Sequence, residues 1–131
     1  MSLVLVDTSI WVEVLRKKQP LDLEALVSIE DVVTCLPIVQ EVFQGIRDDR
    51  AFGIARDAMA HLPHLEDPLE RTIFDAAVDL YRLARKQGLT IRSSTDCLIA
   101  ACAVKHGVEV LHRDRDYSAI ARVSSLRQRE P

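Results

Sequence analysis

The chain has 131 residues, of which 48% are hydrophobic, so it can bury one continuous core but is too short for two ordinary domains. We therefore expect a single domain over residues 1–131. The formal charge of −3 excludes a global positive field, so any contact with nucleic acid must be local. The three cysteines lack C-x-x-C spacing, which argues against a zinc ribbon, a redox dithiol or a secreted disulfide framework.

Short runs rich in Val, Leu and Ile alternate with longer segments whose apolar residues recur every three or four positions, a pattern typical of β/α units. The first predicted strand covers residues 3–6. The Thr8 and Ser9 hydroxyls then cap a helix that stops near Gln19 and Pro20. This helix is apolar over most of its circumference. It is therefore either buried in the core or exposes an apolar face to another protein chain.

The next elements lead to a second acidic residue. We predict a short amphipathic helix over residues 21–29 and a buried strand over residues 32–35. Pro37 suits the first turn of the following helix, because its missing N–H would have no partner there. Glu41 then lies about one turn further into that helix.

The second half of the chain repeats the alternation of helices and strands. The pattern predicts a helical stripe over residues 47–62, a long helix over 69–86 and a helix that begins at Ser93 and ends near Gly107. Strands and a final helix complete the chain, with a short strand at 64–66, a strand at 108–111, a helix at 117–122 and an edge strand near 125–128.

Four acidic residues lie where this β/α arrangement would bring chain ends together. Asp7 follows the first strand and Asp114 follows the strand at 108–111, while Asp96 and Glu41 lie near the beginnings of helices. In an open α/β sheet, ligands bind beyond the carboxyl ends of the strands. Carboxylates about 5 Å apart repel by roughly 3 kcal/mol per pair at an effective dielectric constant near 20. The cluster must therefore take up protons or hold a cation.

The ligand chemistry narrows the choice of cation. Carboxylate oxygens without His or Cys suit hard cations such as Mg²⁺ or Mn²⁺. Such an ion activates water for phosphodiester hydrolysis. Taken singly, Asp7 and Asp96 are explained as helix caps and Glu41 as a surface acid. Asp114 and Asp116 are explained by pairing with the neighbouring arginines. Only their joint placement favours a site.

The strings that carry these acids resemble, in order, the motifs of PIN-domain nucleases, and most closely those of the VapC-type toxins of type II toxin–antitoxin systems. The strings are LVDTSIW at 5–11, PIVQEV at 37–42, TDCLIAA at 95–101 and LHRDRDY at 111–117. The resemblance implies a three-layer α/β/α fold with a central parallel sheet of four to five strands. It also implies an Mg²⁺- or Mn²⁺-dependent endoribonuclease that is inhibited by a small cognate antitoxin and forms a homodimer.

Carried over by position, the resemblance assigns site residues. The residues matching the catalytic and metal-binding acids are Asp7, Glu41, Asp96 and Asp114. The auxiliary positions are Asp116, which resembles a further acid, and the hydroxyl residues Thr8, Ser9 and Thr95. Independently of the resemblance, we expect Arg113 or Arg115 to contact the RNA backbone.

Two further expectations concern partners and location. An antitoxin segment is expected on the apolar face formed by Ile10, Trp11, Val14 and Leu15. The chain shows neither a leader peptide pattern nor an apolar stretch of the roughly 20 residues that cross a bilayer, so we expect a cytoplasmic protein without membrane contact. The alternative function is a non-catalytic PIN-like module whose acidic groove only binds protein.

Overall fold

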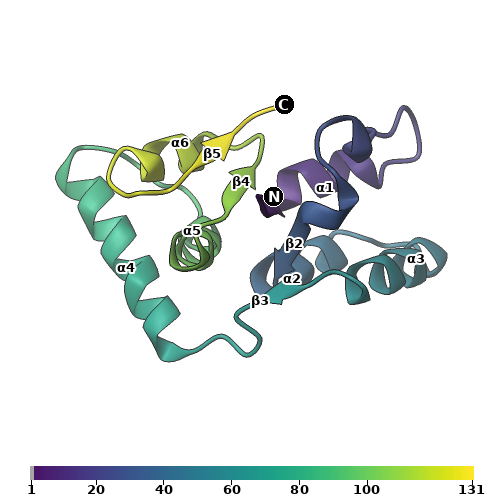
Figure 1. Ribbon diagram of the computed structural model, residues 1–131, viewed down its shortest axis with the longest axis horizontal. Helices are drawn as coiled ribbons and strands as arrows, with labels where there is room; N and C mark the ends of the chain where they lie inside the picture. The colour runs from purple at the N-terminus through teal and green to yellow at the C-terminus, as the bar shows by residue number, and fades with distance from the viewer. Residues whose placement is uncertain (1) are drawn as a thin grey trace.

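The computed structural model describes residues 2–131, which form a central parallel sheet with helices on both faces (Figure 1). This three-layer α/β/α arrangement is the fold class that the sequence predicts. The strands are β1 (Val4–Val6), β2 (Val32–Cys35), β3 (His64–Leu65), β4 (Glu109–Leu111) and β5 (Gln128–Arg129). The helices are α1 (Thr8–Val14), α2 (Leu36–Gln44), α3 (Asp49–Ala60), α4 (Arg71–Lys86), α5 (Ser94–His106) and α6 (Arg115–Ala121).

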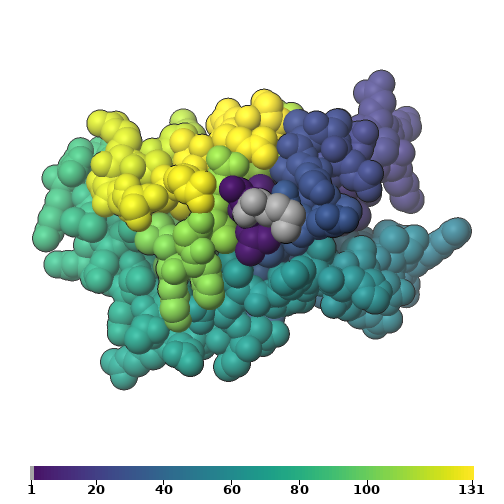
Figure 2. Space-filling view, in the orientation of Figure 1, coloured from purple at the N-terminus to yellow at the C-terminus, as the bar shows by residue number. Residues whose placement is uncertain are grey.

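The strand order within residues 2–131 is β3-β2-β1-β4-β5, and every neighbouring pair is parallel. The chain therefore adds strands on one side of β1 and later returns to the other side with β4. On the face drawn in Figure 2, the purple segment that follows residue 1 lies between the C-terminal segment and a segment near residues 20–35. The order of strands reverses between β1 and β4, and in α/β sheets the crevice at such a switch point binds ligands.

The core explains why the chain adopts these elements. Leu5 and Val6 in β1 are fully buried, as expected for a strand covered by helices on both faces. Helix α5 has buried residues around most of its circumference, including Ile99, Ala100 and Cys102. Its small side chains allow close packing, and it carries the Asp96 carboxyl group into the interior.

Two predicted helices differ from the structure. The amphipathic helix expected over residues 21–29 is absent, and two short 3₁₀ turns, Leu23–Ala25 and Ile29–Asp31, take its place. In this stretch only Leu23 and Val27 are buried, too few to support a helical stripe. Helix α1 ends at Val14 instead of near Gln19. The chain then folds back along the helix, so that the Leu21 backbone N–H donates to the Glu13 carbonyl. The remaining predicted elements lie within about three residues of their observed positions.

The antitoxin face expected on α1 is wrong for its two central residues. Ile10 is fully buried and Trp11 is 6% exposed, and both belong to the hydrophobic core. Val14 and Leu15 are partly buried. The strongly exposed apolar residue of this helix is Val12, at 54%. Within residues 2–131, no helix combines the length and the apolar character needed to cross a bilayer.

Trp11→Ala should lower the free energy of unfolding by about 3–5 kcal/mol, the usual cost of truncating a large buried aromatic side chain. Val12→Ala on the same helix should change it by less than about 0.5 kcal/mol, because Val12 is exposed. Urea unfolding of the two variants checks this. Equal stability of the two variants would show that Trp11 does not belong to the core.

Candidate active site

Asp7 lies at the carboxyl end of β1 and caps helix α1. Its Oδ2 accepts hydrogen bonds from the Ser9 backbone N–H at 3.0 Å and from the Ser9 hydroxyl at 2.6 Å. The expectation that Thr8 and Ser9 supply the cap is therefore wrong, since Asp7 itself is the capping residue. The Ser9 hydroxyl also accepts the backbone N–H of Arg113 at 2.9 Å, which ties the end of β1 to the loop after β4.

A buried tyrosine that the sequence analysis missed connects two of the predicted acids. Tyr117 on α6 is fully buried, and its hydroxyl donates to Asp7 Oδ1 at 2.6 Å and lies 3.3 Å from Asp96 Oδ1. The hydroxyl has a single hydrogen to donate, and the shorter contact identifies Asp7 as its main acceptor. Burial, together with the charges of Asp7 and Asp96, raises the pKa of Tyr117 well above its usual value. The phenol therefore stays a donor.

Three aspartates form the closest carboxylate cluster among residues 2–131. One oxygen from each of Asp96, Asp114 and Asp116 lies within 4.8 Å of the others. Asp116 Oδ2 accepts the backbone N–H groups of Arg92 and Ser93, each at 3.0 Å. Asp116, which the sequence placed only in an auxiliary position, is thus 1% exposed and central to the cluster.

Two carboxylate oxygens in this cluster are buried and accept no hydrogen bond from residues 2–131, namely Asp96 Oδ2 and Asp116 Oδ1. Burying such an oxygen without a partner costs free energy. A divalent cation would satisfy both oxygens and reduce the repulsion among the acids. Since every group is a carboxylate, the donor set fits Mg²⁺ or Mn²⁺.

The pKa of the Asp96 carboxyl group is raised from 3.8 to about 9. Burial is the largest cause, followed by the hydrogen bond and negative charge of Asp114 and by the charge of Asp7. The cluster therefore retains a proton at neutral pH when no cation is bound. Protonation and cation binding are alternative ways of relieving the same repulsion.

Glu41 lies beside this cluster on α2, half-buried. Its Oε1 accepts the Thr8 hydroxyl at 2.9 Å, so the auxiliary residue Thr8 orients it. Burial raises the pKa of Glu41, the hydrogen bond from Thr8 opposes that rise, and the charges of Asp7 and Asp114 add to it. The structure therefore brings all four predicted acids close to one another, together with Asp116, and we call these five residues the acidic crevice.

The arginine nearest the aspartates is one that the sequence analysis did not assign to the site. Arg92 lies in the loop between α4 and α5, with side-chain nitrogens 3.8 Å from Asp114 Oδ1 and 3.8 Å from Asp116 Oδ1. The alternative explanation, in which these acids pair with their neighbouring arginines, is wrong, because both pair with Arg92. Arg113 pairs with Glu13 at 2.6 Å, which directs it away from the cluster.

His112 directly follows β4, and its side chain is fully buried beside the acidic residues. Its ring packs against Tyr117 with the centroids 4.8 Å apart. Its Nδ1 accepts the Asp114 backbone N–H at 3.0 Å, so the ring hydrogen lies on Nε2, which contacts Gln128 Oε1 at 2.5 Å. His112 therefore positions Asp114 and Tyr117 and does not face a substrate.

Comparisons with known proteins agree with this geometry. The PIN domain family profile matches residues 4–123. This chain belongs to the PIN-domain family. It is 38% identical to Ribonuclease VapC11 of Mycobacterium tuberculosis and to VapC ribonuclease Mb1587 of Mycobacterium bovis. In both cases the match covers 95% of this chain and 96% of the relative.

Solved structures share the fold at lower sequence identity. DNA-bound VapBC from Salmonella typhimurium has a TM-score of 0.78 at 14% identity and covers 99% of this PIN-domain chain and 98% of that one. VapBC-5 from Mycobacterium tuberculosis has a TM-score of 0.73 at 20% identity, with full coverage of both chains. VapC20 from the same organism, titled a sarcin-ricin loop cleaving toxin, has a TM-score of 0.68 at 19% identity over 95% and 98% of the two chains.

With a chelator present, Asp96→Asn should raise the melting temperature of this PIN domain, by an amount that grows with pH. The raised pKa means that the folded state holds a proton that unfolding releases, so wild-type stability falls as the pH rises from about 4 to about 9. Asn carries no titrating proton and removes this slope. Thermal melts of both proteins across this range in EDTA provide the measurement. Parallel curves would show that Asp96 titrates normally.

Proposed function

We propose that this protein is a divalent-cation-dependent endoribonuclease and the toxin of a type II toxin–antitoxin module. The observation that carries the proposal is the pair of buried oxygens on Asp96 and Asp116 that accept no hydrogen bond from the described residues and that lie among carboxylates at the switch point of the sheet. Two relatives that are 38% identical and match nearly full length are named VapC ribonucleases, which supports RNA as the substrate.

The proposed cation ligands are Asp96, Asp114 and Asp116, with Asp7 and Glu41 completing the catalytic set. We favour Mg²⁺ or Mn²⁺. The bound ion would supply an activated water and neutralise charge at the phosphate. Asp7 is held by Tyr117 and Ser9, so both of its oxygens keep a defined direction. Positioning of this kind typically affects metal affinity or activity about 10- to 100-fold.

Glu41 is the acid best suited to accept a proton from the attacking water. Its pKa is raised, which makes it a stronger base than an ordinary carboxylate, and Thr8 fixes the direction of its carboxyl group. Arg92 has its side chain 57% exposed beside the aspartates. It is therefore placed to contact a phosphate of the RNA backbone. Arg115 is exposed nearby and remains a proposed backbone contact, whereas Arg113 is paired with Glu13.

Asp96→Asn and Asp116→Asn should each lower the rate of RNA cleavage in Mn²⁺ by about 100-fold or more, as expected for losing one preorganised electrostatic group. Asp57→Asn is the matched control, because Asp57 is exposed on α3 away from the crevice. Cleavage of a mixed cellular RNA is measured with Mg²⁺, with Mn²⁺ and with EDTA. Cleavage at the wild-type rate by Asp96→Asn would rule out this site.

The non-catalytic alternative is not favoured. A module that only bound protein would not need to bury several carboxylates against their repulsion. In this chain all of the predicted acids are present and lie in one crevice. The cost of assembling them is explained by a bound cation.

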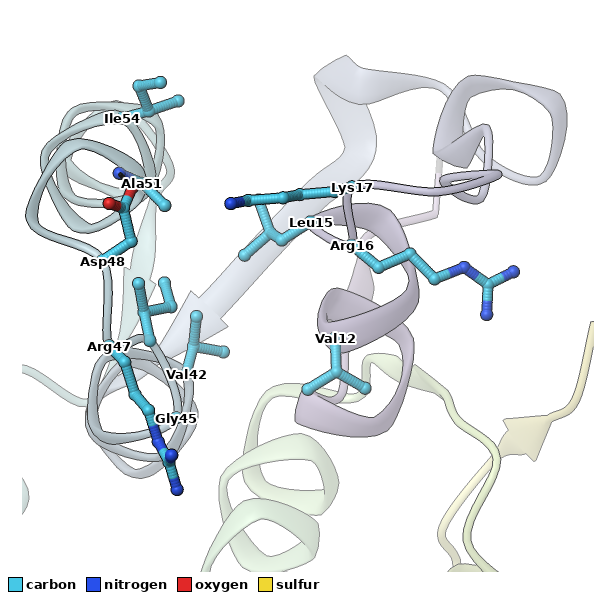
Figure 3. Close-up of a pocket in the computed structure, with 11 residues that line it drawn as sticks. Val12, Leu15, Arg16, Lys17, Val42, Gly45, Arg47, Asp48, Ala51 and Ile54 are labelled. Carbon is cyan, nitrogen blue, oxygen red and sulfur yellow. Dashed lines mark hydrogen bonds between the residues drawn. The ribbon is translucent and has the colours of Figure 1, made fainter.

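We propose that the antitoxin occupies a groove between α1 and the α2–α3 segment (Figure 3). The groove has a volume of about 520 Å³ and is mainly apolar, with Val12 and Ile54 exposed on opposite sides. Lys17 extends from the end of α1 toward α3, and Arg47 lies at the rim. This surface fits an amphipathic segment that carries acidic residues beside its apolar face. The fold neighbour VapBC-5, described as a member of the VapBC family of toxin–antitoxin systems, supports such a partner.

Ile54→Glu should weaken antitoxin binding by about 30-fold or more, since burying a charge at a central apolar contact costs at least what losing a hot spot does. Val78→Glu on α4 is the matched control, because Val78 has a similar exposure outside the groove. Titration calorimetry with the cognate antitoxin measures both affinities. Equal affinities of the two variants would place the antitoxin elsewhere.

Three expectations from the sequence remain predictions: a single PIN domain over residues 1–131, a homodimer and a cytoplasmic location. Light scattering of the purified chain tests the homodimer.

A further inference from the structure

A second hollow opens directly beside the acidic crevice. It has a volume of about 320 Å³ and lies among α2, α4 and α5. Glu41 and Thr95 form its boundary with the crevice, and Thr95 precedes Asp96 on α5. A group bound there would lie next to the atoms that react in the proposed ribonuclease.

The lining of this hollow discriminates against phosphate. Glu41 is the one charged residue among the described residues that line it, and no lysine or arginine takes part. A phosphate would be repelled by Glu41 without any compensating cation. The hollow therefore suits an uncharged group, whereas the phosphate backbone belongs beside Arg92 and the aspartates.

Phe74 provides an aromatic surface in the hollow. It lies on α4 between the buried residues Ile73 and Ala77, yet its own side chain is 47% exposed. An exposed aromatic ring beside a nucleic-acid site offers a platform for a base, and such stacking contributes about 1–3 kcal/mol per base. Pro37 adds a further apolar contact surface.

Gln40 and Gln44 add polar groups of a particular kind. They lie one turn apart on the same face of α2, and both are exposed. Each carboxamide presents a donor next to an acceptor. This is the arrangement that glutamine uses to bind adenine in a bidentate manner.

We propose that this hollow binds the nucleobase adjacent to the cleaved phosphate, stacked on Phe74 and recognised by Gln40 or Gln44, with adenine preferred. The proposal rests on the ribonuclease function and specifies how the same crevice selects its substrate. A competing occupant is a second copy of the chain. Phe74 also lines a neighbouring apolar hollow of about 420 Å³ with Val78 and Tyr81, which another protein surface would cover.

The test is cleavage of a randomised RNA oligonucleotide pool in Mn²⁺, followed by sequencing of the product ends. The wild type should enrich adenine at one fixed position beside the cut by about tenfold. Phe74→Ala and the double variant Q40A/Q44A should abolish most of that enrichment while still cutting. Tyr81→Ala is the matched control, because Tyr81 is a similarly exposed aromatic on α4 outside the hollow, and it should keep the enrichment.

A binding measurement separates failure of this inference from failure of the ribonuclease proposal. Asp96→Asn protein is mixed with an RNA that carries 2-aminopurine, and stacking on Phe74 should quench its fluorescence. Introducing the substitution Phe74→Ala into the Asp96→Asn protein should remove the quenching. If the wild type cuts RNA, the end preference ignores Phe74 and the glutamines, and the quenching ignores Phe74, the subsite is wrong. If Phe74→Ala changes only the molecular mass measured by light scattering, this surface serves self-association and does not bind a base.

Discussion

The mutual repulsion of buried carboxylates at the carboxyl ends of β1 and β4 is the constraint on which the rest of the structure depends. Two of the acids are held by groups that come from distant parts of the chain. Asp7 is bound by the Tyr117 hydroxyl and by Ser9, and Asp116 by backbone N–H groups preceding α5. These hydrogen bonds hold the oxygens near one another in spite of the repulsion. The crevice therefore retains a proton or, as proposed, takes up a divalent cation.

The same geometry makes the crevice sensitive to the packing beneath it. Tyr117 and His112 contact each other in the core, and each also holds an acid: Tyr117 bonds Asp7, and His112 accepts the backbone N–H of Asp114. The short helix α6 thus couples hydrophobic packing to the direction of the carboxylates. A small shift of this helix would separate the oxygens and weaken the proposed cation site, with little change in the sheet itself.

The net charge of this protein is small, but acidic and basic side chains are concentrated at different places on it. The acidic crevice contains Arg92 at its margin, the groove beside α1 has basic residues at its rim, and the hollow beside Glu41 has no cation among its described lining. These three environments favour different groups: a metal ion with a phosphate, an acidic amphipathic segment, and an uncharged base. In the proposals above, the three environments serve catalysis, inhibition and substrate selection on one small domain.

The sequence by itself determined the alternation of strands and helices and the four acids at their ends, because hydrophobic periodicity and strand-end position are local properties. It also favoured a carboxylate site for a hard cation. Only the tertiary structure decided which oxygens have partners and which accept no hydrogen bond, because Tyr117, Arg92 and the N–H groups that bind Asp116 come from distant segments. It also decided that Trp11 is a core residue while Val12 faces a groove. An amphipathic pattern records which residues are apolar, whereas burial depends on which neighbouring elements cover them.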